Sequence, residues 1–139
     1  GDYKSVDVLV TSVEEAKRFA EESGIDAMAV AIGTAHGNYK EKPQLRIDRL
    51  KEIHAAVKTP LVLHGGTGLT ETDFRTCLAN GIQKINIATA SYDASAAMIK
   101  EVAAASPQPK YFDFSDAIVQ GTYENVKKHM HIFGLEHKA

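Results

Sequence analysis

Short apolar segments alternate with amphipathic segments along this chain of 139 residues. Three strands are predicted, at residues 27–32, 61–63 and 84–87. The first two contain only Ala, Met, Val, Leu and Ile, a composition typical of strands buried on both faces. Segments with apolar residues at helical spacing lie between and after the strands. This alternation predicts parallel strands joined by helices, and therefore an α/β fold.

Five helices are predicted from capping residues and apolar periodicity. Thr11 or Ser12 caps the first helix, and Gly24 ends it. Thr70 and Asp73 form a capping box at the start of the third helix. The predicted helices cover about residues 13–23, 46–57, 71–79 and 92–105, with a last helix from about residue 115.

Three strands are too few for a complete parallel α/β domain, because a (β/α)₈ barrel needs about 250 residues. Unpaired strand edges would also be left bare. The expected fold class is therefore a partial TIM (β/α)₈ barrel, made of the C-terminal three strands with their helices plus a C-terminal helix. Residues 1–139 would form the C-terminal portion of a single barrel domain. A compact small α/β domain is the alternative.

Charge and composition limit which partners and which cellular compartment we expect for this chain. The net charge of -2 gives no electrostatic reason to expect nucleic acid or a membrane as a partner. No apolar run is long enough to cross a bilayer. The single cysteine, Cys77, excludes an internal disulfide, fits a reducing compartment and is predicted to lie in the core. We expect a cytoplasmic protein.

Two histidines each follow a predicted strand and are each followed by glycine: His36 after residues 27–32, and His64 after residues 61–63. The carboxyl ends of parallel strands carry the reactive loops of α/β folds. Neighbouring strands lie about 5 Å apart, so both imidazoles can reach one ion. Zinc is the expected metal, with other divalent transition metals left open. The alternative is a pair of hydrogen-bonded loop histidines.

A glycine-rich loop, residues 65–68, separates His64 from the third helix. Glycines expose backbone N–H groups, and a helix N-terminus adds positive potential, so the loop suits a phosphate with Thr67 donating its hydroxyl. Residues 86–89 end the next strand and lie beside this loop in a parallel barrel. Phosphate sites in barrels often use the loops after the last two strands. Together the two segments predict phosphate binding.

Three segments, at residues 34–37, 63–68 and 84–89, resemble the last three strand-end motifs of the class II, metal-dependent ketose-bisphosphate aldolases, which include fructose- and tagatose-bisphosphate aldolases. The resemblance implies aldol cleavage of a ketose bisphosphate to dihydroxyacetone phosphate and an aldehyde through a metal-stabilised enediolate. It implies His36 and His64 as zinc ligands and Asn86 as a catalytic residue. The residues implied to contact substrate are Gly37, Gly65, Gly66, Thr67, Asn86, Ile87, Ala88 and Thr89.

The family's remaining catalytic groups do not match positions of this sequence. Its third histidine ligand, its general acid/base aspartate and its flexible-loop glutamate are expected in the N-terminal part of the barrel, before Gly1. We therefore expect this chain alone to be inactive and to need that part as a partner. The resemblance also implies a homo-oligomer, a dimer or a tetramer.

Two other functions remain open at this point. Another phosphosugar-binding barrel enzyme, an isomerase or epimerase, would share the phosphate loops without needing paired histidines. A non-catalytic phosphate-binding fragment would hold phosphate and no metal.

Overall fold

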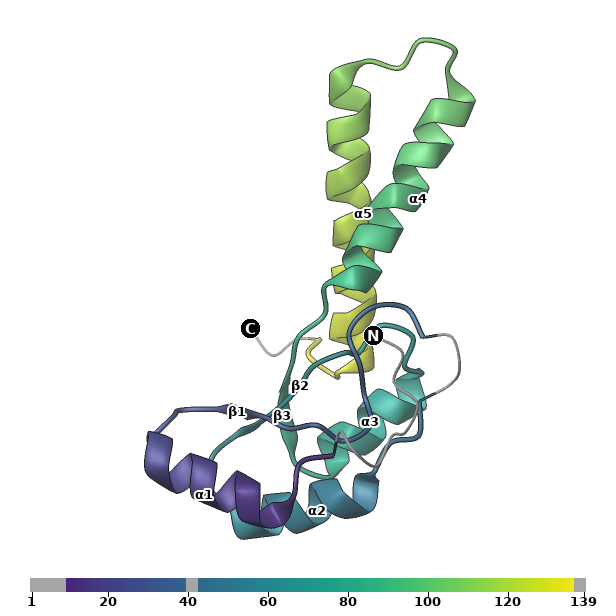
Figure 1. Ribbon diagram of the computed structural model, residues 1–139. Coiled ribbons are helices and arrows are strands. Elements are labelled where there is room, and N and C mark those ends of the chain that lie inside the picture. The colour runs from purple at the N-terminus through teal and green to yellow at the C-terminus, as the bar shows by residue number, and fades with distance from the viewer. Residues whose placement is uncertain (1–9, 40–42, 137–139) are drawn as a thin grey trace. The chain divides into compact units, whose positions relative to one another are not determined.

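The computed structural model describes residues 10–39 and 43–136, which form two compact units divided after Ile87. The first unit contains a parallel sheet, in which β1 (Met28–Ala29), β2 (Leu61–Leu63) and β3 (Ile82–Ile85) pair in sequence order. Helices α1 (Val13–Ser23), α2 (Ile47–Ala56) and α3 (Glu71–Ala79) alternate with these strands (Figure 1). The predicted order of parallel strands and helices is confirmed.

Local sequence signals set the helix ends. The Ser12 side chain accepts the N–H of Glu15 while the Glu15 carboxylate accepts the N–H of Ser12, and Gly24 ends α1 in a left-handed conformation. Thr70 and Asp73 form the same reciprocal box at the start of α3. Each box provides partners for N–H groups that the helix itself leaves unpaired.

The core of the first unit surrounds β2, whose three residues are all buried. Helices α1 and α2 contact each other, as do α2 and α3. Burial on both faces explains why β2 lacks polar residues. The largest fully buried side chains are Phe74, Ile32, Leu50, Ile53, Leu61, Leu63 and Cys77.

Several predicted boundaries are wrong. The first strand is two residues long rather than six: the Val30 N–H still donates to the Val62 carbonyl at 3.3 Å, but Ile32 forms an antiparallel bridge with Val10 instead of pairing with β2. The third strand begins two residues early, at Ile82, because its pairing with Leu61 starts directly after the turn at Gly81. Pairing partners are a tertiary property that the apolar pattern does not contain.

The second unit is a helical hairpin of α4 (Thr89–Ala105) and α5 (Tyr111–Ile132), which run side by side (Figure 1). Both helices begin earlier than predicted, at residue 89 rather than about 92 and at residue 111 rather than about 115. At Gly121 the helices approach so closely that a Cβ would lie 2.6 Å from the Ser95 Cα. The Ser95 hydroxyl donates to the Ile118 carbonyl at 2.9 Å.

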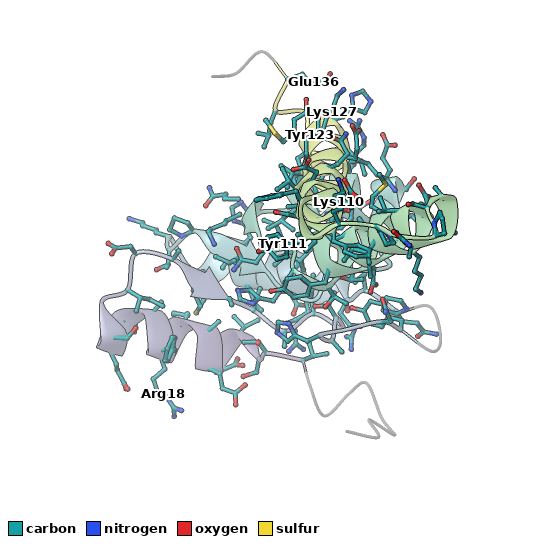
Figure 2. All side chains as sticks on the ribbon, turned by 90° about the horizontal axis from the view of Figure 1, so that it is seen from above. Arg18, Lys110, Tyr111, Tyr123, Lys127 and Glu136 are labelled. Atoms are coloured by element: carbon teal, nitrogen blue, oxygen red, sulfur yellow. The ribbon has the colours of Figure 1, made fainter. Side chains whose placement is uncertain are left out.

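The outer face of α5 carries large apolar side chains that remain exposed. They recur at spacings of three, four and seven residues, on the face opposite Ala117 and Gly121, which are buried. Figure 2 shows Tyr123 and Lys127 together on this helix, and the Lys127 ammonium lies 5.9 Å from the Tyr123 ring centroid. We call this face the α5 stripe; its members are Phe112, Val119, Tyr123, Val126 and Met130.

Among the described residues, no helix has the length and apolar content needed to cross a membrane.

Candidate functional site

His36 and His64, the two histidines predicted to follow neighbouring strands, lie next to each other. The His36 and His64 ring centroids are 5.6 Å apart, and the ring planes are nearly perpendicular at 82°. His64 directly follows β2, and His36 follows the segment that continues from β1. The pairing of β1 with β2 brings the two loops together at the carboxyl end of the sheet.

This spacing fits two imidazoles that share one metal ion. With zinc–nitrogen distances of about 2.0 Å, an ion lies about 3.2 Å from each ring centroid. Two rings on a tetrahedral ion then have centroids about 5.2 Å apart, and about 6.4 Å is the upper limit for any angle. The observed 5.6 Å lies inside this range. Within residues 10–39 and 43–136, no third His, Cys, Asp or Glu completes a metal-binding cluster.

Asn86 contacts the second histidine. Its backbone N–H donates to the Leu63 carbonyl at 3.0 Å, extending the pairing of β2 with β3 by one step. This step places its side-chain Nδ2 2.9 Å from the His64 Nε2. Because an amide nitrogen only donates, His64 Nε2 accepts, and a cation at that nitrogen would have to replace Asn86.

Lys84 orients the Asn86 side chain. Its ammonium donates to the Asn86 Oδ1. An ammonium has no acceptor, so the oxygen of the amide must face Lys84 and the nitrogen must face His64. The sequence indicated Asn86 as a site residue but gave no reason to add Lys84. The role of Lys84 depends on its contact with the Asn86 side chain, which in turn contacts His64.

The glycine-rich loop approaches the His36 loop with no room for a side chain. A Cβ on Gly65 would lie 2.4 Å from the Ala35 carbonyl oxygen, and Gly65 has a φ of 69°. A Cβ on Gly66 would lie 2.7 Å from Ile87 and 2.9 Å from the Phe74 ring. Close contact therefore requires glycine at both positions, and at Gly65 the left-handed backbone conformation favours glycine as well.

A tyrosine that the sequence analysis did not single out joins the two histidine loops. The Tyr39 hydroxyl donates to the Gly65 carbonyl at 2.6 Å and accepts the Ala35 N–H at 2.9 Å. Burial raises the pKa of Tyr39 above its usual value, so the phenol keeps its proton. The only available signal was its position three residues after His36, which has no general meaning without the structure.

The remaining predicted substrate contacts divide between the two units. Gly37 has a φ of 91°, with no atom of the described residues near its Cβ position, and Thr67 is buried beside the glycines. Ala88 and Thr89 belong to the hairpin unit, as the N-cap and first residue of α4. At the start of α3, the capping box uses the N–H groups of Thr70 and Asp73, and the first turn carries the acidic residues Glu71 and Asp73.

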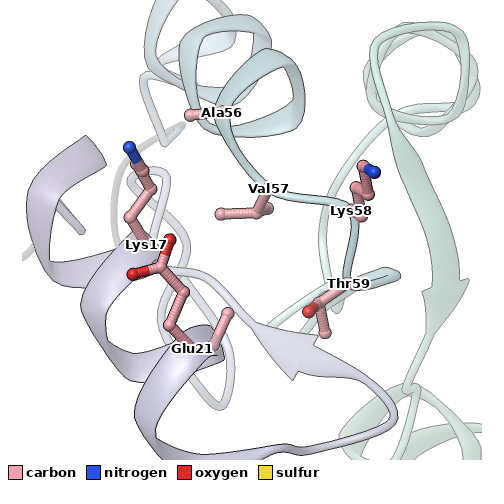
Figure 3. Close-up of a pocket in the computed structure, with 7 residues that line it drawn as sticks. Lys17, Glu21, Ala56, Val57, Lys58 and Thr59 are labelled. Carbon is pink, nitrogen blue, oxygen red and sulfur yellow. The ribbon is translucent and has the colours of Figure 1, made fainter.

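One cavity of the first unit lies away from the histidines. It measures about 300 Å³ and is lined by α1 and by the turn between α2 and β2, including Lys17, Glu21 and Lys58 (Figure 3). Thr59 in its wall precedes β2, whereas His64 follows that strand. The cavity is therefore at the amino end of the sheet, opposite the end where the reactive loops of parallel α/β folds lie.

Comparison with known proteins places these features in a family. The family model for class-II fructose-bisphosphate aldolase matches residues 1–138. A sulfofructosephosphate aldolase from Alkalicoccus urumqiensis is 37% identical over 134 residues, which are 96% of this chain and 47% of that protein. The chain thus spans about half the length of this curated relative.

Solved structures agree. The YdjI aldolase from Escherichia coli K12 superposes with a TM-score of 0.81 at 35% identity, over 94% of this chain and 48% of that one. A structure from Coccidioides immitis, described as a putative fructose-1,6-bisphosphate aldolase, superposes with a TM-score of 0.76 at 26% identity. The match covers 94% of this chain and 45% of that one. The expected fold class, a partial (β/α)₈ barrel, is confirmed. The chain belongs to the class-II fructose-bisphosphate aldolase family.

Proposed function

We propose that the complete protein is a zinc-dependent lyase that cleaves, and forms by condensation, a ketose bisphosphate of the fructose- or tagatose-1,6-bisphosphate type. The products are dihydroxyacetone phosphate and an aldehyde. In this proposal residues 1–139 are the C-terminal portion of one barrel domain, and they supply two metal ligands and the phosphate-binding loops.

One observation carries the proposal: the His36 and His64 rings lie 5.6 Å apart at the carboxyl end of neighbouring parallel strands. What supports ligation is that both rings come from residues following neighbouring parallel strands and meet at a spacing that one ion can bridge. The family match favours an aldolase over the isomerase or epimerase alternative. Asn86 beside His64 adds an amide where a substrate hydroxyl or oxyanion would lie.

Each residue has a distinct role in the proposal. His36 and His64 hold a divalent cation, which supplies Lewis-acid stabilisation of negative charge on the substrate oxygens. Asn86 donates a hydrogen bond to the reacting part of the substrate, oriented by Lys84. The backbone N–H groups of the turn at Gly65 and Gly66 are proposed to bind the phosphate.

Other substrate contacts follow from the same loops. Gly37, Thr67 and Ile87 are proposed to contact dihydroxyacetone phosphate, together with Ala88 and Thr89 at the start of α4. No acidic residue lies in the first turn of α4, so its N-terminus favours an anion more than that of α3 does. The third metal ligand and the general acid/base are proposed to come from the N-terminal part of the same barrel.

A phosphorylated ketose that carries a sulfonate is a second candidate substrate. The relative at 37% identity is named a sulfofructosephosphate aldolase. Both candidates share the half that becomes dihydroxyacetone phosphate, which is the half that the histidines, Asn86 and the glycine loop are proposed to bind. Cleavage rates of the complete protein with fructose-1,6-bisphosphate, tagatose-1,6-bisphosphate and sulfofructose phosphate distinguish the candidates.

We also propose a homo-oligomer in which the α5 stripe packs against the same stripe of a second copy. The stripe is self-complementary in charge: Asp113 and Lys127 lie seven residues on either side of Gln120, which adjoins Val119 near the middle of the stripe. An antiparallel partner therefore sets Asp113 of each copy opposite Lys127 of the other. We propose a cytoplasmic location, because Cys77 is a free, buried thiol.

The decisive experiment replaces His64 with alanine in the complete protein. We expect His64→Ala to lose bound zinc and aldol cleavage together, because the proposed site loses one of the imidazoles that hold the ion. His54→Ala, which removes an exposed histidine of α2, is the matched control and is expected to keep both. Zinc content is measured after dialysis, and cleavage by the release of dihydroxyacetone phosphate. Full zinc content and full activity in His64→Ala would overturn the proposal.

A further inference from the structure

Tyr39 occupies a position that links both histidine-bearing loops. Its hydroxyl accepts the N–H of Ala35, the residue before His36, and donates to the carbonyl of Gly65, the residue after His64. One oxygen atom thus contacts the chain neighbours of both proposed metal ligands. Both hydrogen bonds are part-buried, which limits competition from water.

The packing around Tyr39 leaves little freedom for either loop. A Cβ on Gly68 would lie 3.1 Å from the Tyr39 ring, so the ring is held against the glycine-rich loop. On the other side of the contact, Gly65 lies directly against the Ala35 carbonyl. The phenol therefore sits where the two loops pack against each other.

We propose that Tyr39 is a positioning residue, whose hydroxyl ties the two loops together and so fixes the spacing of the His36 and His64 imidazoles. Two short strands alone hold these loops weakly, since β1 and β2 contain two and three residues. Without the hydroxyl, the Ala35 N–H and the Gly65 carbonyl lose a shared partner, and each loop becomes free to take a different conformation. The inference rests on the proposed function only in treating the two histidines as metal ligands.

The test compares Tyr39→Phe with Tyr111→Phe in the complete protein. Tyr39→Phe removes one oxygen and keeps the packed ring, and Tyr111→Phe makes the same change at a tyrosine that is 77% exposed. Removing groups that orient metal-binding histidines typically weakens metal binding by about 10- to 100-fold. We expect Tyr39→Phe to bind Co²⁺ about tenfold more weakly and with an altered visible absorption spectrum, and Tyr111→Phe to match the wild type.

A metal-free measurement separates this inference from the proposed function. The ¹⁵N chemical shifts of the His36 and His64 rings are expected to change in Tyr39→Phe and not in Tyr111→Phe. If the wild type fails to bind Co²⁺, the proposed function is wrong, and the ring shifts still decide the role of Tyr39. Ring shifts unchanged by Tyr39→Phe, or an unchanged Co²⁺ affinity and spectrum in a wild type that binds the ion, would refute the positioning role.

Discussion

At the scale of single residues, the candidate site depends on a chain of donors that ends on a histidine. Lys84 donates to Asn86, and Asn86 donates to the His64 Nε2 at 2.9 Å. The Asn86 amide and a cation compete for one lone pair if the cation binds at that nitrogen. Asn86 is thereby linked both to metal binding and to the substrate contact proposed for it.

Replacing Asn86 with alanine tests this link. We expect Asn86→Ala to retain zinc at least as tightly as the wild type, because a competitor for His64 is removed. We expect kcat for aldol cleavage to fall about 100-fold, the usual loss when a hydrogen-bond donor to developing charge is removed. Gln83→Ala, at an exposed amide of the same strand, is the control. Equal kcat in Asn86→Ala and the wild type would exclude Asn86 from the reaction.

Two glycines with similar φ angles differ in what surrounds them. Gly24 and Gly65 have φ angles of 62° and 69°, but only Gly65 lies against other backbone atoms, those of Ala35. We expect Gly24→Ala to lower the free energy of unfolding by about 1 kcal/mol, from conformational strain alone. Gly65→Ala adds a backbone clash, so its loss should be about 3 kcal/mol or more. Urea denaturation of both variants measures the difference, and equal losses would show that the close approach is unimportant.

At the scale of the elements, short-range signals decided where helices begin. Ser12 with Glu15 and Thr70 with Asp73 form the boxes that start α1 and α3. Helix α2 begins differently: the Arg46 guanidinium binds both oxygens of Asp48, at 3.1 and 2.8 Å. These hydrogen bonds, with the Arg49 backbone, lower the pKa of Asp48 from 3.8 to about 2.

The lowered pKa of Asp48 predicts a specific dependence of stability on pH. A carboxylate with a lower pKa in the folded state stabilises the fold above its unfolded pKa and loses that effect as pH falls through the folded pKa. We therefore expect Asp48→Asn to be less stable than the wild type at pH 7, with the difference shrinking between about pH 4 and about pH 2. Denaturation of both proteins at several pH values measures this, and a difference independent of pH would contradict the assignment.

At the scale of the whole molecule, the largest unexplained feature is the exposed α5 stripe. Val119 is 66% exposed and Tyr123 56%. Apolar side chains in such a row are costly to leave in water, and the proposed packing against a second copy would bury them. The heptad-like spacing of the stripe is the geometry that helices use to pack along each other.

A charge in the middle of the α5 stripe tests the proposed homo-oligomer. We expect Val119→Glu in the complete protein to shift the sedimentation coefficient toward that of a monomer, because it would bury a carboxylate near its own symmetry mate. Gln120→Glu introduces the same charge on the adjacent, exposed position off the stripe and should leave the assembly unchanged. An unaltered assembly in Val119→Glu would exclude the α5 stripe as the contact.

The sequence alone determined the order of elements, the capping boxes and the buried β2, because each follows from residues close together in the chain. It also indicated His36, His64 and Asn86, since parallel strands deliver their following residues to one edge of a sheet. It located strand and helix ends less well, as the two-residue β1 and the early starts of α4 and α5 show.

Only the tertiary structure decided which side chains meet. The perpendicular histidine rings, the Lys84–Asn86–His64 series and the Tyr39 hydroxyl between Ala35 and Gly65 all join segments brought together by strand pairing. Such contacts depend on register and on side-chain direction to within about an ångström, and hydrophobic periodicity carries neither. The residue types determine which chemistry this chain can perform. The geometry of the candidate site depends on how the three short strands align.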